Sequence, residues 1–313
     1  MKIKEYKRIL FIEAEPKKGF NFGYYLIINH LGEDNKLQLI GECNNTSPQQ
    51  TTEENLKMCL NQVLKNNLLY KHMSNMLNNS AVVYPTFLRP YENNDPTLKN
   101  IDTHSLTSQA ISSDRKDIKR VDRQFAAMIA HAKKTLKKLG YETTNKIIMT
   151  GFSSSAKFAQ RFAFLYPELV SAVIAGGISA ILCLPVNKYK NHTLNFPLGT
   201  NNYELLTGKK FDKKTFNKIP HYVFMGEKDQ NDPLPYSDSF TDEERKILIS
   251  ITHKNMQTRW NKMLGIIKEL KLNVYPYLMP GIEHSPRGIP EIMQENLSLL
   301  KKQIARQESP KRK

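Results

Sequence analysis

The sequence has no apolar run of roughly 18 residues, the length that a membrane-spanning helix requires. Residues 1–16 contain no apolar core of roughly 7–15 residues and no small-residue cleavage site, so a secretory signal peptide is not expected there. Cysteine is scarce, and Cys43, Cys59 and Cys183 are far apart and odd in number. This spacing argues against a disulfide framework and against a zinc site. We therefore expect a cytoplasmic protein that binds no metal.

Acidic residues are outnumbered: 30 Asp and Glu face 46 Lys and Arg, for a formal net charge of +16. Such an excess can indicate binding to nucleic acid, because a protein that neutralises phosphates releases counterions. The basic residues are nevertheless dispersed along the chain, and the longest terminal run is only Lys311-Arg312-Lys313. We interpret the charge as a solvated surface and do not expect nucleic acid as a partner. If the positive charge has a function, basic residues should lie around the rim of a pocket and favour anionic substrates.

Short apolar runs alternate with longer amphipathic segments, a pattern typical of an α/β fold with a mostly parallel sheet and helices on both faces. The first two runs are close enough to pair as a hairpin. Helices are expected over 53–78, 121–139, 247–270 and 290–307, with Gly140 as a C-cap. Strands are expected over 9–12, 24–28, 37–41, 81–85, 146–150, 171–175, 222–225 and 273–277.

Two polar, irregular segments, 88–117 and 178–219, interrupt this alternation and are longer than ordinary loops. We interpret them as insertions that border the active site of a single domain spanning 1–313. Six aromatic or histidine side chains in them are candidates to line a pocket. They are Tyr91, His104, Tyr189, His192, Phe196 and Tyr203.

A nucleophile elbow is predicted where the apolar run 146–150 leads into Gly-Phe-Ser-Ser-Ser and then into a helical pattern. Ser153 is the candidate nucleophile, and the tight turn requires small residues two positions away, which Gly151 and Ser155 provide. The amide of Ser154, at the start of the helix, is a candidate oxyanion donor. The alternative is that these serines only cap the helix.

The remaining members of a catalytic triad are expected in the order acid, then histidine. Asp229 follows a strand and a glycine turn and is the first choice for the acid, with Asp232 as a close rival and Glu227 a distant one. His284 lies in a loop beyond the last strand, where a base can reach the serine. His253 also follows the acid but falls within a predicted helix, where a surface role is more ordinary.

A second oxyanion donor is expected from the loop after the third strand, where Asn44 or Asn45 offers a backbone N–H or a side-chain amide. The alternative for both residues is a simple Asx turn. Cys43 is a weaker candidate nucleophile, because no elbow surrounds it and a free cysteine is commonly buried.

These motifs resemble the α/β-hydrolase superfamily of serine hydrolases, and in particular bacterial esterases similar to polyhydroxyalkanoate depolymerases and feruloyl esterases. The similarity covers roughly 20–300 and rests on 146–155, 162–168, 173–177, 226–232 and 281–284. It implies Ser153 as nucleophile, Asp229 as acid and His284 as base. The sequence departs from the family at Ser155, where glycine is usual, and in lacking a His-Gly oxyanion motif. Without a signal peptide or disulfides, polymer degradation outside the cell is disfavoured.

The resulting hypothesis is a serine carboxylesterase acting on a small-molecule ester, with no cofactor. The preference for an ester over an amide comes from the resemblance. A peptidase or an acyltransferase on the same fold remains open, as does a non-catalytic binding protein with a basic surface.

Overall fold

The computed structural model describes residues 6–31, 34–46, 51–65, 68–90, 101–236 and 239–286, together with 298 and 300–302. The main strands are β1 (Tyr6–Ile12), β2 (Tyr24–His30), β3 (Lys36–Glu42), β4 (Asn79–Pro85), β5 (Glu142–Thr143), β6 (Ile147–Phe152), β7 (Val170–Gly176), β10 (His221–Gly226) and β11 (Val274–Met279). All eight strands that the sequence predicts are present, each within three residues of the expected ends. The short β5 is a strand of this sheet that the sequence does not predict.

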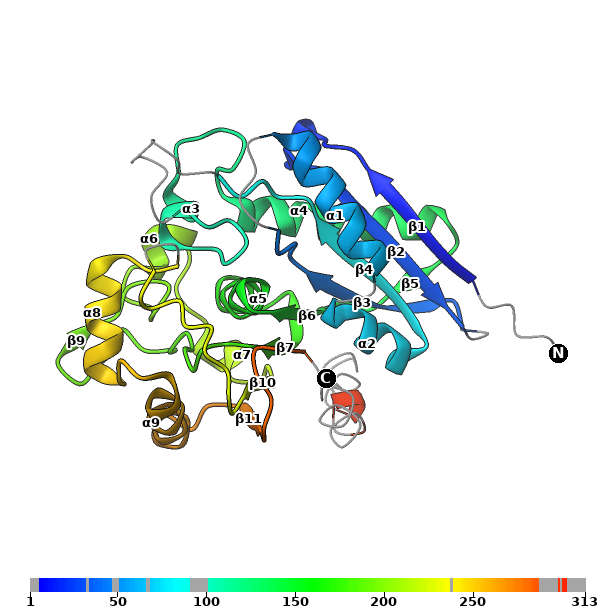
Figure 1. The fold of residues 1–313 in the computed structure, drawn as a ribbon. Coiled ribbons are helices and arrows are strands. Elements are labelled where there is room, and N and C mark those ends of the chain that lie inside the picture. Colours follow the sequence, from blue (N-terminus) through cyan, green and yellow to red (C-terminus); the bar gives the residue numbers. More distant parts are fainter. Residues whose placement is uncertain are drawn as a thin grey trace, which may run out of the picture.

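These strands form one mixed sheet in the order β1-β2-β4-β3-β6-β7-β10-β11, with β5 paired to β3. As predicted, β1 and β2 form an antiparallel hairpin, and β2 is also antiparallel to β4. From β4 to β11 all neighbours are parallel. Figure 1 shows β1 at one end of the sheet and β11 near the other. The carboxyl ends of the parallel strands therefore meet at one edge, where ligands bind in open α/β sheets.

Helices cover both faces of the sheet, because successive strand residues point to opposite sides. In β6, Ile147 and Met149 belong to one core cluster and Ile148 to the other. The helices α1 (Thr52–Lys65) and α2 (Leu69–Leu77) contribute to the second cluster. The first cluster is covered by α4 (Val121–Lys138), α5 (Ser154–Leu165), α8 (Asp242–Ile251) and α9 (Met256–Glu269).

Two segments that the sequence predicts as single helices are each divided into two helices in the structure. The expected helix over 53–78 ends at Lys65 and restarts at Leu69. The expected helix over 247–270 is broken between α8 and α9, where Asn255 caps α9 by accepting from the Thr258 N–H. His253 therefore lies in a connection, which corrects its predicted place within a helix. The predicted helix over 290–307 lies almost wholly outside the described residues.

The two long segments contain more structure than their composition predicts. The segment 88–117 holds α3 (Ser108–Ser112), capped by Thr107. The segment 178–219 holds the β8–β9 hairpin (Lys188–Tyr189 and His192–Thr193), α6 (Tyr203–Thr207) and α7 (Lys213–Phe216).

Several candidate pocket residues instead belong to the hydrophobic core. Tyr189, Phe196 and Tyr203 are 7%, 1% and 4% exposed, and all three pack in the first core cluster. His192 contacts the Ser250 hydroxyl at 2.9 Å, and Tyr91 lies outside the described residues. Apolar burial explains the difference, since these rings are more stable against the core than at a wet rim.

Among the described residues, no helix combines the length and the apolar character that crossing a membrane requires.

Candidate active site

Ser153 stands at the junction of β6 and α5 in a backbone conformation that few residues other than glycine adopt. Its φ is 62° and its ψ is −118°. Its N–H donates to the Gly176 carbonyl at 2.8 Å, so the strained turn is held against β7. The Ser153 side chain forms no capping hydrogen bond with the helix, which argues against the helix-capping alternative. Strain of this kind persists where the surrounding structure enforces it, and it is concentrated at functional sites.

The small residues around Ser153 explain how the turn closes. A Cβ on Gly151 would lie 2.2 Å from the Ser155 carbonyl oxygen, so no larger residue fits there. The Ser155 hydroxyl accepts from the Phe152 N–H and donates to the Phe152 carbonyl, both at 2.9 Å. The serine that departs from the family's glycine therefore makes two hydrogen bonds within the turn.

His284 lies in the loop after β11, and its ring is placed next to the elbow. Its ring centroid is 4.7 Å from that of Phe152, the residue before Ser153. A Cβ on Gly177, which has a φ of 60°, would lie 2.7 Å from His284 Cε1. Glycine at this position thus makes room for the imidazole next to Phe152.

His284 contacts Asp229, the first-choice acid. The distance from His284 Nδ1 to Asp229 Oδ2 is 2.8 Å, and Asp229 is 1% exposed. Because a carboxylate can only accept, the proton of a neutral imidazole resides on Nδ1 and Nε2 is left as an acceptor. The other oxygen of Asp229 accepts from the Asn231 N–H at 2.8 Å, so the carboxylate is held in place from two sides.

The two rival acids have other partners. Asp232 is paired with the fully buried Arg259, at 2.7 Å between Oδ1 and Nη2. Glu227 accepts from the Gly281 N–H at 2.8 Å.

The loop after β3 lies beside the elbow, where the second oxyanion donor is expected. The Asn45 side-chain amide donates to the Phe152 carbonyl at 3.2 Å. The Asn44 amide donates to the Phe87 carbonyl at 2.8 Å, and its oxygen accepts from the Phe87 N–H at 3.1 Å. The Asn44 side chain is thus engaged in bracing the loop, and a donor from this residue would be its backbone N–H.

Cys43 is fully buried, and burial raises the pKa of its thiol well above the ordinary value. A thiol that stays protonated is a poor nucleophile.

A groove of about 830 Å³ borders the imidazole of His284. Its lining combines two carboxylates and one lysine with four carboxamides, so the net basic charge of the chain is not expressed there. The lining residues are Glu227, Lys228, Gln230, Asn231, Asn255, Gln257, Glu283 and His284.

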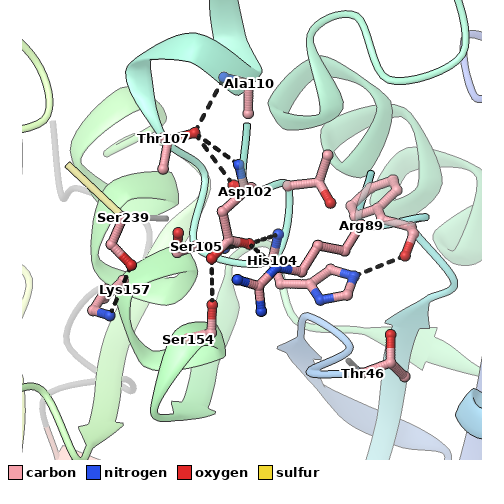
Figure 2. Close-up of polar contacts among 12 residues, drawn as sticks. Thr46, Arg89, Asp102, His104, Ser105, Thr107, Ala110, Ser154, Lys157 and Ser239 are labelled. Atoms are coloured by element: carbon pink, nitrogen blue, oxygen red, sulfur yellow. Dashed lines mark hydrogen bonds and ion pairs between the residues drawn. The ribbon is translucent and has the colours of Figure 1, made fainter. Parts of the chain in front are cut away.

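The sequence did not predict a buried polar cluster that contacts Ser154, the residue after the candidate nucleophile. The Asp102 carboxylate accepts from the Ser154 hydroxyl at 3.1 Å, and Figure 2 shows this contact together with Arg89 and His104 nearby. Asp102 lies in the irregular segment 88–117, where neither periodicity nor a strand end indicated which side chains turn inward. His104, a candidate pocket residue, is fully buried within this cluster.

No protein-family model and no curated protein matches this sequence. Solved structures do match. A poly(aspartic acid) hydrolase from Sphingomonas sp. KT-1 is similar with a TM-score of 0.52 at 13% identity, over 93% of this chain and 98% of that one. A poly(3-hydroxybutyrate) depolymerase from Bordetella parapertussis is similar with a TM-score of 0.51 at 11% identity, over 96% of this chain and 95% of that one. Together with the strand order and the turn at Ser153, these similarities show that the chain has the α/β-hydrolase fold, as its motifs predict.

Proposed function

We propose that the protein is a serine hydrolase that cleaves a carboxylic ester through an acyl-enzyme intermediate. Ser153 is the nucleophile, His284 the general base and Asp229 the acid that orients the base. The observation that carries the proposal is the 2.8 Å hydrogen bond between His284 and Asp229, with the His284 ring against Phe152, the residue before a serine held at positive φ. A helix cap or a surface turn requires neither feature.

The hydrogen bond between His284 Nδ1 and Asp229 supports this role. Asp229 accepts the Nδ1 proton and stabilises the imidazolium that forms when Nε2 takes the proton of Ser153. The serine oxygen then bonds to the ester carbonyl carbon, and His284 returns the proton to the departing alcohol. In the second half, His284 activates a water molecule that releases the acyl group and restores Ser153.

The negative charge that develops on the carbonyl oxygen is stabilised by two N–H groups in the proposal. One is the Ser154 amide at the positive end of α5, and the other comes from the loop of Asn44 and Asn45. Each such donor is worth about 3–4 kcal/mol, or a factor of roughly 10²–10³ in kcat.

The groove next to His284 supports an ester that carries hydrogen-bonding groups. Four carboxamides line it, and amides both donate and accept. The two similar structures are a poly(aspartic acid) hydrolase and a poly(3-hydroxybutyrate) depolymerase. Because both are under 15% identical, we do not assign either substrate to this chain, and a panel of p-nitrophenyl esters of graded chain length is the direct way to define the acyl group.

A fluorophosphonate probe tests the nucleophile. We expect the wild-type protein to be labelled on Ser153, and Ser153→Ala to lose both the label and ester hydrolysis, with kcat lower by on the order of 10⁴–10⁶. Ser250→Ala is the matched control, because Ser250 is exposed on α8 and its hydroxyl hydrogen-bonds to His192 and to the Ile247 carbonyl of its own helix.

The control should keep both the label and the rate. If the wild-type protein is neither labelled nor active on short p-nitrophenyl esters, the catalytic proposal is wrong and a non-catalytic protein on this fold is favoured.

A further inference from the structure

The segment 101–107 contains a cluster of buried polar groups that contact both elements with proposed oxyanion donors, the start of α5 and the loop after β3. It belongs to the long connection between β4 and α4, and Figure 2 shows it above the start of α5. Asp102 and His104 are 2% and 0% exposed. Burying such groups is costly unless they are paired, so their contacts indicate what the segment does.

Asp102 connects this segment to the residue after the nucleophile. Its Oδ2 accepts from the Ser154 hydroxyl at 3.1 Å, and its Oδ1 accepts from the N–H groups of His104 and Ser105 at 2.9 and 3.1 Å. Arg89 Nε lies 3.7 Å from Oδ1. Burial raises the pKa of Asp102, but the charge of Arg89 and the hydrogen bonds outweigh it and hold the pKa below its usual value. The carboxylate is therefore ionised and can only accept.

His104 connects the same segment to the other loop. Its Nε2 is 2.8 Å from the Phe87 carbonyl and 3.0 Å from Asn44 Nδ2. Asn44 in turn holds both the N–H and the carbonyl of Phe87. The imidazole thus joins the segment 101–107 to Phe87 and Asn44 through Nε2, at the start of the loop after β3. Its Nδ1 is buried and has no hydrogen-bond partner among the described residues.

We propose that the segment 101–107 is a brace that sets the geometry of the oxyanion hole, with Asp102 and His104 as its positioning residues. Asp102 orients Ser154, whose N–H is one proposed donor, and His104 orients the loop of Asn44 and Asn45, which supplies the other. This inference rests on the proposed function. Neither residue touches the substrate.

The energetics favour such a device. Oxyanion donors act only when they lie about 2.7–3.1 Å from the developing charge, and a displacement of about 1 Å can lower the rate 10²-fold. A buried carboxylate near an oxyanion would by itself oppose the reaction. The Arg89 guanidinium beside Asp102 offsets that charge, so the brace can use an ionised acceptor close to the site.

Ser154→Ala is the least invasive test, because it removes the hydroxyl that Asp102 holds and keeps the backbone N–H. We expect kcat to fall by about ten- to a hundredfold while KM changes less than twofold, since the donor acts mainly in the transition state. A trifluoromethyl ketone, which forms a tetrahedral adduct with the serine, should bind more weakly by the same factor as the loss in kcat/KM.

Asp102 is tested by two substitutions and a double-mutant cycle. Asp102→Ala should lower kcat as Ser154→Ala does. The double variant should be no worse than either single variant, because each substitution removes the same hydrogen bond between Ser154 and Asp102. Asp102→Asn should recover most of the rate, since an amide still hydrogen-bonds to Ser154. Asp122→Asn is the matched control: Asp122 is also fully buried and paired with an arginine, Arg120, at 2.6 Å, but on α4.

The control should lose stability and keep kcat. The brace is wrong if a folded Ser154→Ala variant hydrolyses the ester and binds the ketone as the wild type does, or if Asp102→Ala and Ser154→Ala multiply in the double variant. If the wild-type protein has no activity and no label on Ser153, the proposed function fails and the brace fails with it. These outcomes are distinct.

Discussion

At the scale of single residues, the structure separates two aspartates that are three positions apart. Both follow the strand β10, and both lie in a turn rich in polar residues. Asp229 contacts His284, whereas Asp232 is paired with the buried Arg259. The sequence ranks Asp229 first because it follows the glycine turn directly, but the partner of each carboxylate depends on α9 and on the loop after β11.

This difference predicts opposite effects of two matched substitutions. Asp229→Asn should lower kcat by about 10⁴, because the amide no longer holds His284 in the required tautomer. Asp232→Asn should change kcat less than tenfold and should lower the free energy of unfolding, because it leaves the buried Arg259 guanidinium without its ion-pair partner. Steady-state kinetics and urea unfolding of both variants measure the two effects.

Equal losses of kcat in the two variants would contradict the assignment. A larger loss for Asp232→Asn would reverse it.

At the scale of elements, the elbow is the feature that the sequence predicted best. The steric demand of a strand-to-helix turn is local, so the small residues at Gly151 and Ser155 are visible in the sequence alone. The two hydrogen bonds of the Ser155 hydroxyl were not predicted. They hold the turn to Phe152 at a position where similar proteins usually have a flexible glycine.

Gly151→Ala should disrupt this turn. Its Cβ would lie 2.2 Å from the Ser155 carbonyl oxygen, which is backbone and cannot move without shifting α5. We expect a destabilisation of about 1–3 kcal/mol and a loss of kcat larger than tenfold, because the donor at Ser154 moves with the helix. Thermal unfolding and ester hydrolysis report the two effects.

Gly140→Ala is the control at a left-handed glycine just after α4, where an added Cβ meets no atom of the described residues within 4 Å. It should cost stability through its φ of 89° and leave kcat unchanged. Unchanged activity in Gly151→Ala would show that the elbow tolerates displacement.

The helices were predicted less well than the strands. The apolar periodicity over 247–270 continues through the break between α8 and α9, because both helices face the same core. The cap at Asn255 and the hydrogen bonds from Arg259 to the His253 and Lys254 carbonyls stabilise the break. These contacts join α9 to the connection before it, and apolar periodicity does not predict them.

At the scale of the whole molecule, two buried groups in different parts of the sheet should oppose each other in the pH dependence of stability. Burial lowers the pKa of His221, at the start of β10, to about 4. Burial raises the pKa of Glu42, at the end of β3, to about 7, although Thr150 and two backbone N–H groups donate to it.

The signs of the two contributions follow from proton binding. Below pH 6.5 the unfolded chain protonates His221 before the folded one does, so this stability is lost as the pH falls from 6.5 through 4. Between pH 4.5 and 7 the unfolded chain ionises Glu42 first, so this stability is lost as the pH rises. Each contribution is about 3 kcal/mol at most, and the two offset each other between pH 4.5 and 7.

Single substitutions should expose each slope. Relative to the wild type, Glu42→Gln should lose more stability on going from pH 7 to 4.5, and His221→Gln should lose less. Urea unfolding at the two pH values measures this. Identical pH dependence in all three proteins would show that these groups do not titrate as their burial requires.

The whole-molecule view also changes the meaning of the charge. The groove beside His284 has two carboxylates and one lysine, whereas Arg89 and Lys157 are placed on the Asp102 side of the elbow. Arg89 and Lys157 therefore pair with the buried Asp102 and Ser239. The groove itself does not have the expected basic rim.

By itself, the sequence determined the α/β class, eight of the nine strands of the main sheet and the turn at Ser153, because each depends on residues that are neighbours along the chain. Only the tertiary structure decided that Asp229 and not Asp232 contacts His284, that Tyr189 and Phe196 belong to the core, and that Asp102 lies against Ser154. These contacts join residues far apart in sequence, and apolar burial together with the pairing of buried polar groups selects them. The periodicity and spacing of residues along the chain do not predict such pairings.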